Sequence, residues 1–136
     1  MRSLFRAFEA GRLRYLVISG QASVLYGAAF FSQDLDLWIE PTERNIRAML
    51  TALGKLRARF HKLTPPLTIP LLRRGHGFHF VVPMGPGPAV YLDVMGQPPR
   101  VGRFEPAFRR ANEMETLWGR IPVVAVEDLV EIKKTN

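Results

Sequence analysis

The sequence predicts an α/β (α+β) fold in which helices flank a small mixed β-sheet. Strand and helix patterns alternate over residues 15–57, and this alternation is typical of layered strand–helix folds. Further along the chain, two pairs of β-prone runs are separated by turn residues, which favours hairpins. A length of 136 residues fits one domain, so we expect a single domain over residues 1–136.

The first part of the chain supplies the alternating elements. Thr42 is a suitable N-cap for a helix whose apolar side chains then recur at helical spacing as far as Leu56. Four elements are expected before it: a short basic amphipathic helix over Leu4–Leu13, a buried strand at Tyr15–Ile18, a helix over Gln21–Ala29 and a strand at Leu35–Ile39.

The second part of the chain is less regular. The final helix is short, so it either docks on the body or begins a longer element. The expected elements are a hairpin of Phe78–Val82 and Val90–Val94 around Gly85–Pro88, a helix over Phe104–Ala111, a hairpin of Thr116–Trp118 and Ile121–Val124 around Gly119, and the helix Val126–Lys134.

Composition excludes several classes of protein. With 47% hydrophobic residues, the chain is too apolar for intrinsic disorder. The absence of cysteine excludes disulfides, iron–sulfur clusters and a thiol nucleophile. We find no secretory signal and no apolar run long enough to span a membrane, so we expect a soluble cytoplasmic protein. The net charge of +7 arises mainly from arginine, which reflects either codon usage or a polyanionic partner.

Three of the four aspartates lie within β-prone apolar sequence, where aspartate is normally depleted. Asp34 and Asp36 are two residues apart, so a strand places both side chains on one face. Two close carboxylates repel each other, and a divalent cation relieves that repulsion. If the strand of Asp93 lies nearby, all three can converge on a two-metal site for phosphoryl transfer. The alternative is that they are solvated strand ends or partners of arginines.

Other polar residues carry weaker signals. Ser19-Gly20 joins a strand to a helix, where backbone amides can bind phosphate, although an ordinary tight turn explains the pair equally well. His61, His76 and His79 are interpreted as surface residues, with phosphate or metal contact as the alternative for the last two. Trp38 is interpreted as a core residue.

In order and spacing, these residues resemble the DNA polymerase β-like nucleotidyltransferase superfamily. The matching residues are Ser19-Gly20-Gln21-Ala22 after a strand, then Asp34-Leu35-Asp36-Leu37, and Asp93 on a later strand. The similarity is greatest to the small bacterial and archaeal branch, which includes minimal nucleotidyltransferases and abortive-infection toxin nucleotidyltransferases. The segment Pro122–Leu129, followed by Lys133, also fits that branch. One departure is the turn, which reads Ser-Gly where the family usually has Gly-Gly or Gly-Ser.

The resemblance implies a nucleotidyltransferase fold and a role for each matching residue. Asp34 and Asp36 would bind Mg²⁺ or Mn²⁺, and Asp93 would be the third carboxylate, which helps to deprotonate the attacking hydroxyl. Ser19 and Gly20 would contact the phosphates of the nucleoside triphosphate. Lys133 would approach the nucleotide.

The leading hypothesis is therefore a metal-dependent enzyme that transfers a nucleoside monophosphate to a hydroxyl. The acceptor would be a protein, a tRNA end or a small molecule, and the resemblance implies a partner protein in a toxin–antitoxin pair. Two alternatives are a catalytically silent binding or regulatory module with the same fold, and a basic nucleic-acid-binding domain without chemistry. The presence of all three strand aspartates argues against both alternatives.

Overall fold

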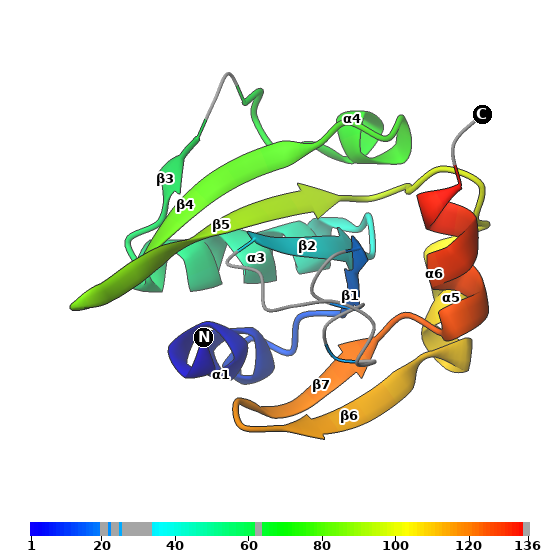
Figure 1. Cartoon of the computed structure of the whole chain (residues 1–136). Helices are drawn as coiled ribbons and strands as arrows, with labels where there is room; N and C mark the ends of the chain where they lie inside the picture. Colours follow the sequence, from blue (N-terminus) through cyan, green and yellow to red (C-terminus); the bar gives the residue numbers. More distant parts are fainter. Residues whose placement is uncertain (20–21, 23–24, 26–33, 62–63, 135–136) are drawn as a thin grey trace.

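The computed structural model describes residues 1–19, 22, 25, 34–61 and 64–134. Within these residues the strands form one seven-stranded sheet in the order β3-β4-β5-β2-β1-β7-β6 (Figure 1). The strands are β1 (Tyr15–Ile18), β2 (Asp34–Ile39), β3 (Arg59–Phe60), β4 (Phe78–Met84), β5 (Gly87–Met95), β6 (Asn112–Thr116) and β7 (Gly119–Val123). The helices are α1 (Arg2–Ala10), α3 (Glu43–Lys55), α4 (Ile69–Arg73), α5 (Phe104–Arg110) and α6 (Val126–Lys133).

The sheet is mixed. β2 runs parallel to β5, and β1 runs parallel to β7, whereas the other neighbouring pairs are antiparallel. Helices flank the sheet (Figure 1), so the predicted α/β (α+β) fold with a mixed sheet is confirmed. No helix in the described part of the chain is both long and apolar enough to cross a membrane.

Most of the predicted elements are present, with three differences. In the hairpin predicted around Gly119, the second strand matches β7. The first strand is β6 and not Thr116–Trp118, because residues 117–118 form the turn. β3 and α4 are additions, too short to show any hydrophobic period. Of the predicted helix Gln21–Ala29, the described residues are Ala22 and Leu25, both helical, and the others lie outside the described residues.

The two faces of β2 pack against different helices. On one face, Leu35, Leu37 and Ile39 of β2 are fully buried. α1 packs on this face, where the Phe8 ring lies 5.1 Å from the ring of Tyr15, the residue opposite Ile39. The other face of β2 carries the alternate residues of the strand, and among them Trp38 is buried against Phe104 of α5, as predicted for a core residue.

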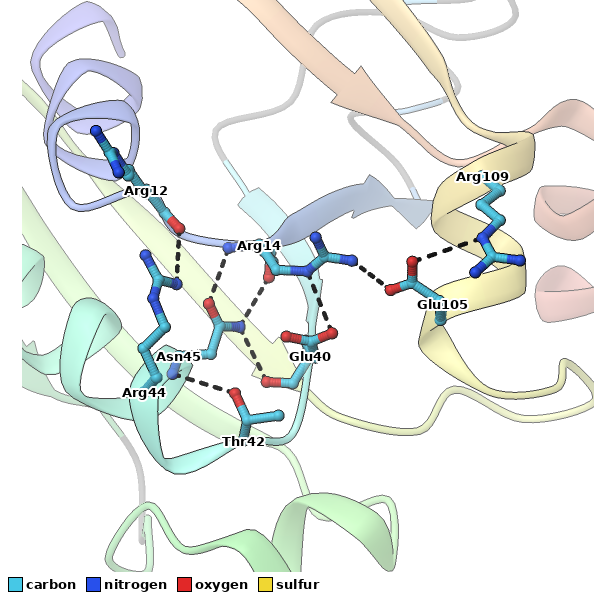
Figure 2. A network of polar contacts seen from close by, with 8 residues as sticks. All are labelled: Arg12, Arg14, Glu40, Thr42, Arg44, Asn45, Glu105 and Arg109. Carbon is cyan, nitrogen blue, oxygen red and sulfur yellow. Dashed lines mark hydrogen bonds and ion pairs between the residues drawn. The ribbon is translucent and has the colours of Figure 1, made fainter.

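Asn45 fixes the end of β2 that leads into α3 (Figure 2). This buried side chain accepts a hydrogen bond from the Arg14 amide at 2.8 Å and donates to the carbonyls of Arg14 and Glu40 at 2.8 and 2.9 Å. The Thr42 hydroxyl caps α3 by accepting from the Asn45 amide, as predicted. The Arg14 guanidinium adds ion pairs to Glu40 and to Glu105 of α5. The ends of β1 and β2 are thereby held on two helices.

Candidate active site

The strand pairing aligns four residues across the sheet. Asp36 of β2 lies beside Asp93 of the parallel strand β5, and Asp93 lies opposite His79 of β4. Ile18 of β1 lies opposite Asp36 on the other side. Directly paired residues on neighbouring strands point to the same face, so the side chains form one row, here called the central row. It places two carboxylates and one imidazole side by side.

A second row of side chains lies next to the central row. On β2, β4 and β5 its members are two residues away from those of the central row. Asp34 pairs with Tyr91, Tyr91 with Val81, and Val81 with Arg59 of β3, and these four residues form the outer row. Because strand side chains alternate with a period of two, the outer row lies on the same face as the central row. The side chains of Asp34, Tyr91 and Arg59 are exposed, whereas Asp36, Asp93 and His79 are half-buried. The three predicted aspartates thus share one partly sheltered face.

The polar side chains of the central row contact each other. His79 donates from Nδ1 to Oδ1 of Asp93 at a distance of 2.5 Å. The carboxyl groups of Asp36 and Asp93 lie close enough for one to hydrogen-bond the other when it is protonated. The chain of contacts therefore runs from β4 through β5 to β2, and each carboxyl group is positioned by its neighbour.

This crowding changes the acidity of Asp36. The pKa of this carboxyl is raised from 3.8 to about 6, mainly by burial and then by the charge and hydrogen bond of Asp93 and the charge of Asp34. His79 acts in the opposite direction. A raised pKa here means that the negative charge of Asp36 lacks compensation in the protein alone. A bound cation would supply that compensation.

A cavity of about 270 Å³ opens beside these side chains, lined by Asp34, His61, Tyr91 and Asp93. The His61 ring contacts the Tyr91 ring at a centroid distance of 4.9 Å. The cavity therefore has an acidic wall and an aromatic wall.

The donor set fits a hard divalent cation. Within the described parts of the chain, no group of three carboxylate or imidazole side chains already forms a metal cage. Mg²⁺ does not need one, because it is usually held by one or two carboxylates together with waters and substrate phosphates. Asp36 and Asp93, which touch each other, and Asp34 on the same strand offer oxygen ligands of this kind.

The other predicted site residues lie at different places. Ser19 directly follows Ile18 of the central row, and its backbone has a left-handed φ of 59°. Gly20 lies outside the described residues. Lys133 is exposed in the last turn of α6, a helix that is attached to α5 by the ion pair of Arg110 and Asp128. The phosphate-binding roles of Ser19 and Gly20 and the nucleotide contact of Lys133 stay predictions.

Three residues of this face were not among the predicted site residues. His79 was interpreted as a surface residue, with phosphate or metal contact as the alternative, and it lies half-buried against Asp93. The predicted runs Phe78–Val82 and Val90–Val94 are symmetric about residue 86 and would pair residues 79 and 93. The structure reaches this register through an irregularity between Val82 and Met84, because the turn itself pairs Met84 with Gly87. Tyr91 shares a face with Asp93 through the strand period of two. His61 follows a two-residue strand that no sequence pattern marked.

The fold has a counterpart among solved structures. The crystal structure of a "putative nucleotidyltransferase" from Thermotoga maritima superposes with a TM-score of 0.62, at 13% sequence identity. The match covers 95% of this chain and 77% of that one. The chain has a nucleotidyltransferase-like fold. No protein-family model matches the sequence, and no curated protein matches it either.

Proposed function

We propose that this protein is a metal-dependent nucleotidyltransferase, which transfers a nucleoside monophosphate from a nucleoside triphosphate to a hydroxyl group. The observation that carries this proposal is the alignment of Asp36 and Asp93 on neighbouring parallel strands, with Asp34 on the same face. The nucleotidyltransferase-like fold supports it. Mg²⁺ or Mn²⁺ at these carboxylates would neutralise the triphosphate and stabilise the pyrophosphate that leaves.

The residues of the central row have distinct tasks in this reaction. Asp93 would accept the proton of the attacking hydroxyl, whose oxygen forms the new bond to the α-phosphorus as the bond to pyrophosphate breaks. His79 holds the Asp93 carboxylate by its hydrogen bond and so fixes its orientation. Asp36, together with Asp34 of the outer row, would anchor the metal and the triphosphate. Positioning and charge neutralisation account for most of such catalysis.

The finer assignments extend the same proposal. Ser19 and Gly20 would bind the phosphates, because Ser19 directly follows Ile18, the residue of β1 in the central row. Lys133 would bind the nucleotide from the end of α6. Membership of the small branch with minimal and toxin nucleotidyltransferases, and a partner protein in a toxin–antitoxin pair, follow from the sequence resemblance alone.

The test is thermal stabilisation by each nucleoside triphosphate with Mg²⁺. A ligand at a concentration of 100 times its Kd stabilises by about 2.7 kcal/mol, which raises Tm by roughly 10 °C for a domain of this size. The wild type should show this gain with at least one nucleotide, and only when Mg²⁺ is present. Absence of any gain with all four nucleotides would contradict the proposal.

The double variant Asp34→Asn/Asp36→Asn is the matched control, because it keeps the side-chain shape and removes the charge. It should lose the gain from Mg²⁺ and nucleotide. An equal gain in the variant would show that the aspartates do not hold the metal. Turnover is tested by transfer of the label from α-labelled nucleotide to the acceptor, with pyrophosphate release measured in parallel. Binding without turnover on any acceptor class would favour a catalytically silent module.

A further inference from the structure

The aromatic wall of the cavity is distinct from its carboxylates. The ring planes of His61 and Tyr91 are tilted by 52°, and 40% of Tyr91 is exposed. A pair tilted in this way does not cover either ring completely, so area remains for a further planar group. The two rings lie on the same cavity as Asp34 and Asp93, next to the atoms that would react.

His61 is fixed in place before any ligand binds. Its backbone amide donates to the carbonyl of His79 at 2.8 Å, and its carbonyl accepts from the Thr64 hydroxyl at 2.9 Å. The same Thr64 hydroxyl accepts from the His79 amide at 3.3 Å. The segment that carries His61 is thus held on β4. A ring on an anchored backbone that already contacts Tyr91 loses less entropy when a ligand stacks on it than a ring on a free segment.

A positive charge accompanies the rings. Arg59 is exposed and lies in the outer row with Tyr91, separated from it by Val81. Its side chain emerges on the same face of the sheet as the cavity. The protein also has a net charge of +7, which favours polyanionic ligands. Aromatic rings beside a cationic side chain are the combination that binds single-stranded nucleic acid.

We propose that His61, Tyr91 and Arg59 form an acceptor subsite for the end of a single-stranded nucleic acid. The terminal base stacks on the two rings, a backbone phosphate pairs with Arg59, and the terminal hydroxyl reaches Asp93. The subsite lies on the β3–β5 side of the carboxylates, whereas the turn at Ser19 lies on the β1 side. The rings therefore contact the acceptor, and the triphosphate binds on the other side of the carboxylates, at Ser19. This assignment of the acceptor rests on the proposed function.

The ring contribution is tested by fluorescence anisotropy with a short 5′-labelled oligoadenylate, in Mg²⁺ and without nucleoside triphosphate. Tyr91→Leu should weaken binding by about 5- to 100-fold, the usual effect of removing one stacking ring. Tyr91→Phe keeps the ring and should bind like the wild type. Phe60→Leu is the matched control, because Phe60 is an exposed ring whose side chain lies on the opposite face, against Phe80. It should leave binding unchanged.

The charge contribution is tested by the salt dependence of the same binding. Arg59→Gln should reduce the slope of log K against log salt by about 0.7, the value for one phosphate contact on a single strand. Arg120→Gln, an exposed arginine on β7, should leave the slope unchanged.

Two results would overturn the subsite: Tyr91→Leu binding the oligonucleotide as well as the wild type, or Phe60→Leu losing as much affinity. A tyrosine-containing peptide that binds in a Tyr91-dependent manner, while RNA and DNA oligonucleotides do not, would assign the rings to a protein acceptor instead. The Asp34→Asn/Asp36→Asn variant should still bind the oligonucleotide. Failure of the metal–nucleotide test is thereby distinguishable from failure of the subsite.

Discussion

Replacement of Asp36 by asparagine should stabilise the metal-free protein at neutral pH. Burial and the neighbouring carboxylates raise the pKa of Asp36 from 3.8 to about 6. This difference corresponds to a penalty of at most about 3 kcal/mol for the ionised form. Because Asp36 is only partly buried and solvent screens its neighbours, we expect about half of that, ~1.5 kcal/mol. For a chain of this length such a change raises Tm by roughly 6 °C.

The pH dependence has a definite sign. The folded state holds the Asp36 proton more tightly than the unfolded state, so the wild type is free of the penalty below pH 4 and loses stability as the pH rises toward 6. Asp36→Asn has no such loss, so the gap between the two proteins should open between pH 4 and 6 and stay constant above it.

The measurement is thermal unfolding in EDTA, followed by circular dichroism at closely spaced pH values. A second arm repeats the comparison in the Asp93→Asn background, where the strongest charged neighbour of Asp36 is removed and the gain should shrink. If Asp36→Asn is no more stable than the wild type at pH 7.5, the carboxylates are not crowded as argued. A constant gap down to pH 4 would contradict the electrostatic origin of the gain.

Three further predictions concern the scaffold and the central row. Asn45→Ala removes three hydrogen bonds of a fully buried side chain and should lower the unfolding free energy by about 3 kcal/mol in a urea titration. Gly96→Ala brings a methyl group within 2.7 Å of Leu72 and should destabilise by about 1–3 kcal/mol, whereas Gly54→Ala meets open space in α3 and should stabilise by about 0.5–1 kcal/mol. His79→Leu should raise the Mg²⁺ concentration needed for nucleotide-dependent stabilisation by about 10-fold, while His79→Asn, whose amide can replace Nδ1, should restore it.

The sequence predicts local structure well here because the strands are strongly apolar and the turns are marked. The spacing of Asp34 and Asp36 is enough to place both on one face of β2. What no local pattern contains is which strands are neighbours. Asp93 joins the pair only because β5 inserts between β4 and β2, a non-local parallel pairing. The resemblance to a known family implied that the strands of Asp36 and Asp93 are neighbours, and the strand pairing gives their register.

The histidines show the opposite case. The alternation of Phe78, His79 and Phe80 already indicated a strand with the imidazole on the face opposite the rings. A surface assignment followed because a face with polar residues on a hairpin is usually solvated. The structure differs because that face carries Asp93 on the next strand, which pairs with the imidazole. A polar residue that alternates with apolar residues on a strand therefore faces either solvent or a polar partner on the next strand. Only the register of the two strands distinguishes these cases.

The energetic cost of ionising Asp36 also bears on which kind of ligand the site binds. Native domains are stable by only about 5–15 kcal/mol, so a penalty near 1.5 kcal/mol at one carboxyl is substantial. A module that bound a polyanion through arginines alone would need no second carboxylate against Asp93, and asparagine would satisfy the same hydrogen bond without the charge. A cation bound beside the two carboxylates would offset the charge. Local stability given up at a few positions is typical of functional sites. The cost therefore favours a cation-binding site over a module that binds polyanions through arginines alone.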